Sequence, residues 1–283
     1  MKLRWKASLF MAVLFSFLTV LSAAAAAAPG AKPILLEGAW DFEMSKLASG
    51  LKDTKQQQFG GWTYTSGTLN GYPVVVCRTG EGAARAAAAT AVGIEHFHPQ
   101  AVINQGTAGG NDPALHNYDI VLGKKSFDSS SWRSHPSPAG AGVDYKDIEL
   151  RGTYDPTAGL RDPNSQIYYM ADPELLAAAQ AVKNKYTRGS IVAGCINTSN
   201  CWNEQIDRIL WLHRAYGASC EEMETNAAAQ ICQEYHIPFL GIRVISDAAI
   251  HHEGFCPATA EACQKYVLQG VGRYVSDKKH AAK

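Results

Sequence analysis

The stretch Cys220–Asp247 constrains this chain more than any other part of the sequence. It begins with an acid cluster, CEEMET, continues through a helix of small residues, and ends in the apolar run Ile237–Ile245, which stops abruptly at Ser246-Asp247. In open α/β folds, ligands bind beyond the carboxyl ends of the strands. Carboxylates at the start of one element and at the end of the next strand can therefore meet around a small ligand. We expect a pocket lined by Glu222, Met223, Glu224 and Asp247.

Apolar runs of strand length alternate with helical patterns along the rest of the chain. The runs predict strands at 33–38, 62–65, 72–77, 101–105, 119–125, 189–194 and 237–245. The helical patterns begin at Asp41 and cover 83–98, 172–186, 204–216 and 257–278. Because no Pro/Gly-rich linker is long enough to separate domains, the pattern predicts a single three-layer α/β domain.

Three segments outside these elements are informative. The turn Arg78–Gly82 exposes backbone N–H groups that could cradle a phosphate, but it matches neither the P-loop nor the dinucleotide fingerprint and is equally typical of a plain tight turn. The cluster Gly106–Gly110 directly follows a strand. Glycines at such a place indicate that a ligand or another backbone segment approaches the chain closely. Residues 127–165 are rich in Ser, Pro, Gly and Asp, and we interpret them as a surface excursion that extends towards the pocket.

The N-terminus has the features of a secretory signal. Lys2, Arg4 and Lys6 form a positive region without acids, Ala7–Leu21 is apolar, and Ser22–Ala28 supplies small-residue cleavage sites. The alternative is a membrane anchor, for which the apolar stretch is short. We therefore expect a signal peptide at 1–28, a mature domain at 29–283, and a secreted or periplasmic protein.

Charge argues against two classes of partner. Without the first 28 residues the chain has 23 basic and 26 acidic side chains, a net charge of −3. Such a balance gives no bulk attraction to nucleic acid or to an anionic membrane surface. The apolar content of 46% with 18% charged residues is ordinary for a globular protein.

The seven cysteines allow disulfides in an exported protein. We expect bridges between Cys195 and Cys201 and between Cys256 and Cys263, which are close in sequence and lie in loop-like contexts. Cys77 ends the run VVVC and is expected to be a buried thiol. A zinc site is disfavoured because no CxxC pair is present, and the run His251-His252-Glu253 is only weak support for a metal.

Four blocks of the sequence are recognisable together. In chain order they are Gly38–Glu43, Thr79–Gly82, Glu95–Gly110, and Glu222–Thr225 together with Arg243–Asp247. They resemble the purine nucleoside phosphorylase and uridine phosphorylase superfamily and, within it, are most similar to the 5′-methylthioadenosine/S-adenosylhomocysteine nucleosidases. The resemblance implies a nucleoside phosphorylase-like domain with a central, mixed, twisted β-sheet flanked by helices. It also implies a small-molecule nucleoside substrate, no cofactor, and a homodimer whose neighbouring subunit helps to complete the site.

The resemblance assigns the two catalytic carboxyl groups. Asp247 is implied to be the general acid that protonates N7 of the departing purine, and it indicates adenine because relatives specific for 6-oxopurines tend to have Asn there. Glu43 is implied to be the general base that activates the attacking water. Taken alone, Asp247 would be read as a helix-capping residue and Glu43 as a solvated acid in a first helical turn.

The remaining implied roles concern water and substrate binding. Thr107 and Arg243 would hold the water, Glu224 would accept hydrogen bonds from the ribose 2′- and 3′-hydroxyls, and Met223 would pack beneath the sugar. Trp202 would stack on the purine, with core packing as its alternative. Two further residues, whose individual roles the resemblance leaves open, belong to the same blocks and are expected to bind substrate: Glu222 and Ser246.

Hydrolysis is favoured over phosphorolysis because the arginines that the resemblance would imply as phosphate ligands are missing from two segments. The phosphorylases carry an arginine shortly before a Gly-rich loop at the end of a strand and another near the first Gly turn, whereas neither Gly38–Glu43 nor Ile103–Gly110 contains a basic residue. The sequence therefore predicts an exported hydrolase of adenine nucleosides. A phosphorylase of the same fold and a non-catalytic storage or nucleoside-binding protein remain the alternatives.

Overall fold

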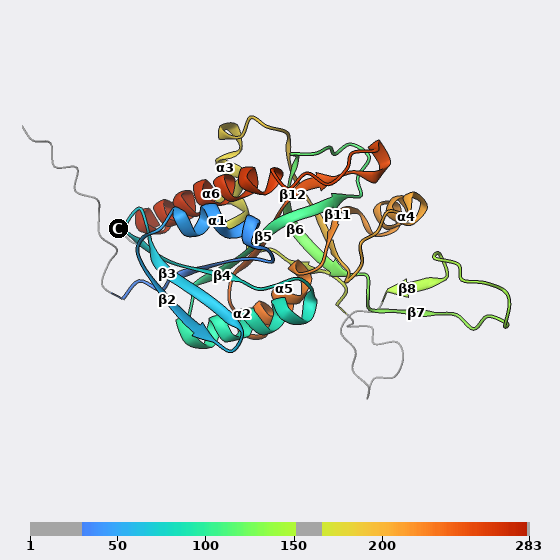
Figure 1. Cartoon of the computed structure of the whole chain (residues 1–283), viewed down its shortest axis with the longest axis horizontal. Helices are drawn as coiled ribbons and strands as arrows, with labels where there is room; N and C mark the ends of the chain where they lie inside the picture. The colour runs from blue at the N-terminus through green and yellow to red at the C-terminus, as the bar shows by residue number, and fades with distance from the viewer. Residues whose placement is uncertain (1–29, 151–165, 282–283) are drawn as a thin grey trace, which may run out of the picture.

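The computed structural model describes residues 30–150 and 166–281, and within them one mixed β-sheet organises the molecule (Figure 1). Its strand order is β11-β10-β6-β12-β5-β1-β4-β3-β2, and β9 pairs with β6. The strands are β1 (Ile34–Gly38), β2 (Lys52–Phe59), β3 (Trp62–Leu69), β4 (Tyr72–Arg78), β5 (Ala101–Gly110), β6 (Ile120–Asp128), β9 (Tyr169–Met170), β10 (Ile191–Thr198), β11 (Ala218–Glu222) and β12 (Phe239–Asp247). A separate hairpin joins β7 (Trp132–Ser134) to β8 (Ile148–Leu150).

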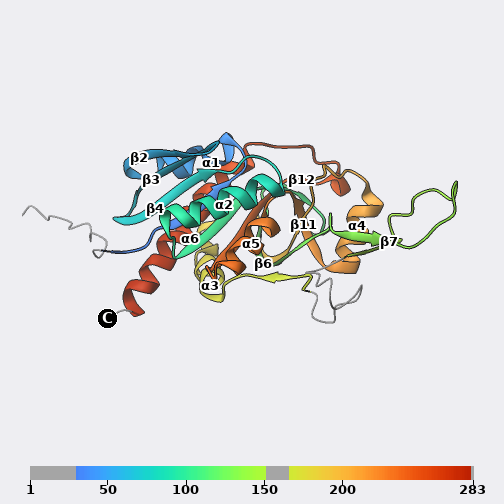
Figure 2. The same ribbon diagram turned by 90° about the horizontal axis from the view of Figure 1, so that it is seen from below.

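Helices cover both faces of this sheet, as Figures 1 and 2 show. On one face, α1, α3 and α6 bury a core with β1, β4 and β12, and on the other α2 and α5 pack over β1, β3 and β4. The helices are α1 (Asp41–Ser49), α2 (Ala83–Phe97), α3 (Pro173–Ala181), α4 (Ile206–Tyr216), α5 (Thr225–Glu234) and α6 (Thr259–Ala281), with short 3₁₀ turns at Lys183–Lys185 and Ala249–His251. The predicted three-layer α/β architecture is therefore confirmed.

The central strands owe their position to their sequences. β1 and β4 are almost continuously apolar and pair in parallel, because a strand covered on both faces can carry apolar side chains at every position. By contrast, β2 reads KDTKQQQF and is mostly exposed at the sheet edge. Apolar periodicity cannot reveal such a strand, and the sequence prediction lacks it.

The sheet closes on itself at the end that carries the site. β11 pairs in parallel with β10 and also pairs antiparallel with β5, so that β11, β10, β6, β12 and β5 form a ring. The Gly-rich cluster 106–110 is part of this ring: β5 continues through it to Gly110 instead of ending in a loop at Gln105. Closure pairs both edges of each strand in this ring, whereas β2 keeps a free edge, and it brings the ends of β5, β11 and β12 together.

Two expectations about cysteine pairing are wrong. Cys195 lies buried on β10, Cys201 is exposed in the following loop, and all seven cysteines are free thiols. Cys263 is likewise buried on α6, whereas Cys256 precedes that helix. Closeness in sequence does not orient two Cβ atoms towards each other, and here the strand and the helix commit their cysteines to the core. Cys77 is the buried thiol that was expected.

Two other predicted segments differ from the structure in extent. The helix expected over 172–186 ends at Ala181 and is followed by a 3₁₀ turn. The excursion at 127–165 begins with the last residues of β6 and contains the β7–β8 hairpin, which projects from the body in Figure 1. Residues 151–165 lie outside the described residues.

The expected signal peptide also lies outside the described residues, so it stays a prediction. If the secretory features are correct, the N-terminal sequence of the exported protein should begin at or near Pro29, after the small-residue tract. An intact N-terminus starting at Met1 would contradict cleavage. Within the described part of the chain, none of the helices is long and apolar enough to cross a membrane.

Candidate active site

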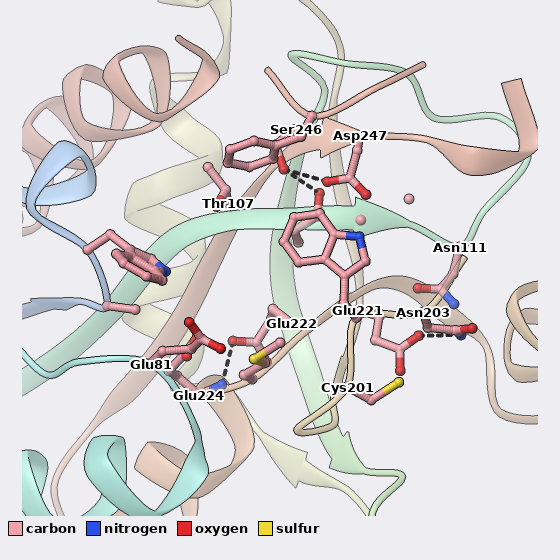
Figure 3. A pocket seen from close by; sticks show the side chains of 18 of the residues that line it. Glu81, Thr107, Asn111, Cys201, Asn203, Glu221, Glu222, Glu224, Ser246 and Asp247 are labelled. Carbon is pink, nitrogen blue, oxygen red and sulfur yellow. Dashed lines mark hydrogen bonds between the residues drawn. The ribbon is translucent and has the colours of Figure 1, made fainter. Parts of the chain in front are cut away.

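A pocket of about 290 Å³ opens at the carboxyl ends of β1, β5, β11 and β12 (Figure 3). Its position agrees with the rule that ligands bind beyond these strand ends. Eight of the nine predicted site residues line it: Glu43, Thr107, Trp202, Glu222, Met223, Glu224, Ser246 and Asp247. The ninth, Arg243, is 1% exposed and lies beneath the pocket, among the acids.

Glu43 is a buried, fully hydrogen-bonded carboxyl group and not a solvated helix acid. One oxygen accepts hydrogen bonds from the backbone N–H groups of Ala39 and Trp40, both at 3.0 Å. The other accepts from the backbone N–H and the hydroxyl of Thr107, at 2.7 and 2.8 Å. A Cβ at Gly106 would lie 2.6 Å from this oxygen, so only glycine fits there. The side chain is thereby fixed between β1 and β5.

Arg243 and Glu222 form an ion pair beneath the pocket. The Arg243 guanidinium donates to Glu222 through Nε at 3.0 Å and through Nη2, and it also donates to Asn104 at 2.6 Å. Glu222 in turn accepts the backbone N–H groups of Glu224 and Thr225. These bonds fix the turn that follows β11, and so they position Met223 and Glu224 at the pocket wall.

This ion pair leads to a prediction about stability. We expect Arg243→Met to lower the free energy of unfolding by about 3–5 kcal/mol, because it leaves the Glu222 carboxylate buried without its cation. Urea denaturation of the single variant and of Arg243→Met/Glu222→Gln measures this cost. The second substitution should recover part of the loss, since the uncompensated charge is removed. A single variant as stable as the wild type would contradict the role of the pair.

Glu224 connects the acid cluster to the Gly turn before α2. Its Oε1 accepts the backbone N–H of Gly82 at 2.8 Å, and its Oε2 lies 3.7 Å from Nη2 of Arg243. Burial, reinforced by the neighbouring Glu222 carboxylate, raises the pKa of Glu224 to about 8. The next N–H of the turn, that of Ala83, donates to Asn200. Both N–H groups are thus occupied, which argues against the phosphate-cradle interpretation of this turn.

Asp247 reaches the pocket through an irregularity at the end of β12. Ile245 pairs with Ala108 and Asp247 with Gly109, so that Ser246 is the extra residue of a bulge, a feature common beside active sites. The Ser246 hydroxyl lies 2.8 Å from Oδ1 of Asp247. Burial raises the pKa of Asp247, which favours the acid form that a proton donor requires.

Aromatic side chains form one wall of the pocket. Trp202 is 60% exposed, so core packing does not explain it, and its ring lies edge-on to Phe255 with centroids 5.6 Å apart. Phe42 lies 6.3 Å from Phe255 and 6.4 Å from Trp40. The resulting row presents ring surface suited to an aromatic ligand.

The sequence prediction did not include several residues that line the pocket. Trp40 and Phe42 belong to the recognised block Gly38–Glu43 but were given no role. Glu221 was noted as part of the acid cluster, also without a role. Glu81 lies inside the recognised block Thr79–Gly82 but was likewise given no role. The others carried no local pattern that points to a site: Asn111, Cys201, Asn203 and Phe255.

The segment after β12 is tied to the loop before β6. The carboxylate of Glu253 lies 2.8 Å from Nδ1 of His116 and accepts the backbone N–H of Asn117 at 2.8 Å, while the ring of His251 stacks on that of His116. Within residues 30–150 and 166–281, no three His, Cys, Asp or Glu side chains gather in a way that could hold a metal ion.

Comparison with known proteins identifies the family. A family model described as the phosphorylase superfamily matches residues 33–270. A 5′-methylthioadenosine/S-adenosylhomocysteine nucleosidase of Bacillus licheniformis is 30% identical over 85% of this chain and 98% of its own length, and one of a Marinomonas species is 29% identical over 76% and 85%.

Solved structures agree with this assignment. The nucleosidase of the same name from Neisseria meningitidis, in complex with methylthio-immucillin-A, has a TM-score of 0.70 and 25% identity over 85% of this chain and 98% of its own. A futalosine hydrolase of Helicobacter pylori has the same TM-score at 21% identity and so shares the fold. This chain belongs to the phosphorylase superfamily and, within it, to the 5′-methylthioadenosine/S-adenosylhomocysteine nucleosidases.

Proposed function

We propose that this protein is an exported enzyme that hydrolyses the N-glycosidic bond of adenine nucleosides of the methylthioadenosine and S-adenosylhomocysteine type. The observation that carries the proposal is the convergence of Asp247, Glu224 and Glu43 on one pocket of about 290 Å³. The names of its relatives support the same activity. The homodimer implied by the resemblance stays a prediction, because the structure is that of one chain.

In the proposed reaction, the C1′–N9 bond breaks as Asp247 delivers a proton to N7. The bonding electrons pass to the purine, and C1′ develops positive charge. Protonation is needed because adenine leaves poorly as an anion, and acid catalysis of this kind contributes about 10²–10⁴-fold. The raised pKa of Asp247 keeps that proton available.

Water completes the reaction at C1′. Glu43 accepts one proton from the water as the water oxygen bonds to C1′. The Thr107 hydroxyl, which donates to the Glu43 carboxylate at 2.8 Å, orients the carboxylate and the water. Glu224 and Met223, which follow β11, would hold the ribose hydroxyls and the sugar face, while Trp202 would cover the base. Arg243 contributes through Glu222 and Glu224, the side chains that it contacts.

Charge in the pocket favours water over phosphate as the nucleophile. Among the described residues that line it, none is Lys, Arg or His, and six are acidic: Glu43, Glu81, Glu221, Glu222, Glu224 and Asp247. A phosphate anion would therefore find no cation on the pocket wall, and those of the carboxyl groups that are ionised would repel it.

The experiment measures adenine release from methylthioadenosine with and without inorganic phosphate. We expect equal rates and free methylthioribose as the second product in both cases. Strict dependence on phosphate, with a sugar phosphate as product, would establish phosphorolysis instead. Absence of release from methylthioadenosine, S-adenosylhomocysteine and adenosine under both conditions would favour the storage or binding alternative.

A further inference from the structure

Gly109 lies between two acidic side chains in the closed part of the sheet. It pairs with Asp247 on β12 and with Glu221 on β11, so the side chains of these two acids leave the sheet on the face that Gly109 shares. All three residues line the pocket. With strands about 4.8 Å apart, the backbones of Asp247 and Glu221 are separated by roughly 10 Å.

The space above Gly109 is suited to a flat ring. A Cβ there would lie 3.0 Å from Oδ2 of Asp247, so a side chain would fill the gap between the two acids. Glycine has no side chain, so the floor of the pocket between the two acids stays open. If the imidazole edge of the purine meets Asp247, the opposite, pyrimidine edge faces β11 and therefore Glu221.

Glu221 is a buried carboxyl group with unused hydrogen-bonding capacity. It is 9% exposed, and its Oε2 accepts a hydrogen bond from Nδ2 of Asn203 at 2.9 Å. Within the described part of the chain, its Oε1 has no hydrogen-bond partner, and the same is true of Oδ1 of Asn111 at this end of the pocket. Figure 3 shows these three side chains together, on the opposite side of the view from Glu81 and Glu224.

An unpaired carboxyl oxygen at this depth points to a ligand. Buried polar atoms in folded proteins almost always have partners, and leaving one unpaired costs free energy. The proposed mechanism uses Glu43, Glu224 and Asp247 and gives Glu221 no task. The Watson–Crick edge of a purine would supply the missing partner, and it is also the part of the base that distinguishes adenine from 6-oxopurines.

We propose that Glu221, oriented by Asn203, contacts position 1 of the purine and selects the base by its protonation state. The ionised carboxylate accepts the N1–H of a 6-oxopurine, and the acid form donates its proton to the bare N1 of adenine. This inference rests on the proposed function, because it takes the base to lie between Asp247 and Glu221.

The surroundings of Glu221 determine how this preference varies with pH. Burial raises its pKa, against the lowering effect of the Asn203 amide, Arg208 on α4 and the Asn111 amide, while Glu222 adds a further increase. Two thiols also lie near it, those of Cys201 and Cys220. As pH falls through the pKa of Glu221, the fraction of Glu221 in the acid form increases, and the preference for adenine over hypoxanthine should rise.

The test compares adenosine with inosine as substrates. The ratio of their kcat/KM values is measured between about pH 5 and pH 8 in the wild type, in Glu221→Gln, and in the control Asp207→Asn, an exposed acid on α4 outside the pocket. We expect the wild-type and control ratios to change by about tenfold in favour of adenosine as pH falls, since one charged hydrogen bond is exchanged. In Glu221→Gln the ratio should stay flat with pH, because an amide neither gains nor loses a proton.

Binding of the free bases separates this inference from the proposed activity. Adenine and hypoxanthine are titrated calorimetrically into wild type and Glu221→Gln, with thermal unfolding of each variant as the check on folding. If the wild type releases no base from any nucleoside, the proposed function fails, and the pH dependence of the two binding constants still decides the role of Glu221. A wild-type preference that does not vary with pH, or one that Glu221→Gln leaves unchanged, overturns the inference.

Discussion

We expect Asp247→Asn to lower kcat for adenine release by about 10²–10⁴-fold. Asparagine retains an oxygen for the Ser246 hydroxyl, which lies 2.8 Å from Oδ1, so the local geometry should persist. What is lost is the carboxylic proton that neutralises the departing purine at N7. Because this proton is transferred in the transition state, kcat and kcat/KM should fall together.

The control for this substitution is Asp277→Asn. Asp277 lies on α6, is paired with Arg273 at 2.8 Å, and does not line the pocket. Adenine release is followed in both variants at saturating methylthioadenosine, and thermal unfolding shows whether each is folded. A folded Asp247→Asn variant that keeps more than a tenth of the wild-type kcat would disprove the assignment of the general acid.

The second large effect is expected for Glu43→Gln. The loss of the base that accepts a proton from water should again reduce kcat by about 10²–10⁴-fold. In addition, the two carboxylate oxygens accept bonds from four donors, and an amide offers one acceptor oxygen in their place. We therefore also expect the free energy of unfolding to fall by about 1–3 kcal/mol.

Two matched variants separate these effects. Asp41→Asn changes an acid on the same helix whose side chain is 87% exposed, and it should alter neither rate nor stability appreciably. Thr107→Ser keeps the hydroxyl that bonds to Glu43 and should retain most of the activity. If Glu43→Gln is less stable but fully active at a temperature where it remains folded, then Glu43 supports the fold and another group activates the water.

The sequence was a good guide wherever a local pattern reported burial. The apolar runs at β1, β4 and β12 predicted strands close to the observed ones, because central strands bury both faces. The same reasoning failed at β2, whose polar residues lie at an exposed edge and carry no burial signal. It also ended β5 too early, since a Gly-rich strand looks like a loop when its partners on β11 and β12 are unknown.

The candidate site shows a similar division. Motif order predicted Glu43 and Asp247 as site residues, and both line the pocket. The local sequence around Glu43 is that of a solvated helix acid, and only the folded structure reveals its four buried hydrogen bonds. For Glu221, the sequence offers an acid beside other acids. Its distinction comes from pairing with Gly109, a contact between segments far apart in the chain.

The sequence alone determined the α/β class, the order of most strands and helices, and which carboxyl groups stand at the ends of strands, because these follow from local periodicity and motif identity. The tertiary structure decided that β11 returns to pair with β5, that Arg243 lies beneath Glu222 and Glu224, and that the cysteines stay apart as free thiols. These outcomes depend on strand order and register, which are set by packing between distant segments. The acid cluster of Cys220–Asp247 is therefore visible in the sequence, but the ion pair of Glu222 with Arg243 and the positions of Glu221 and Glu224 on the pocket wall arise from the closure of the sheet.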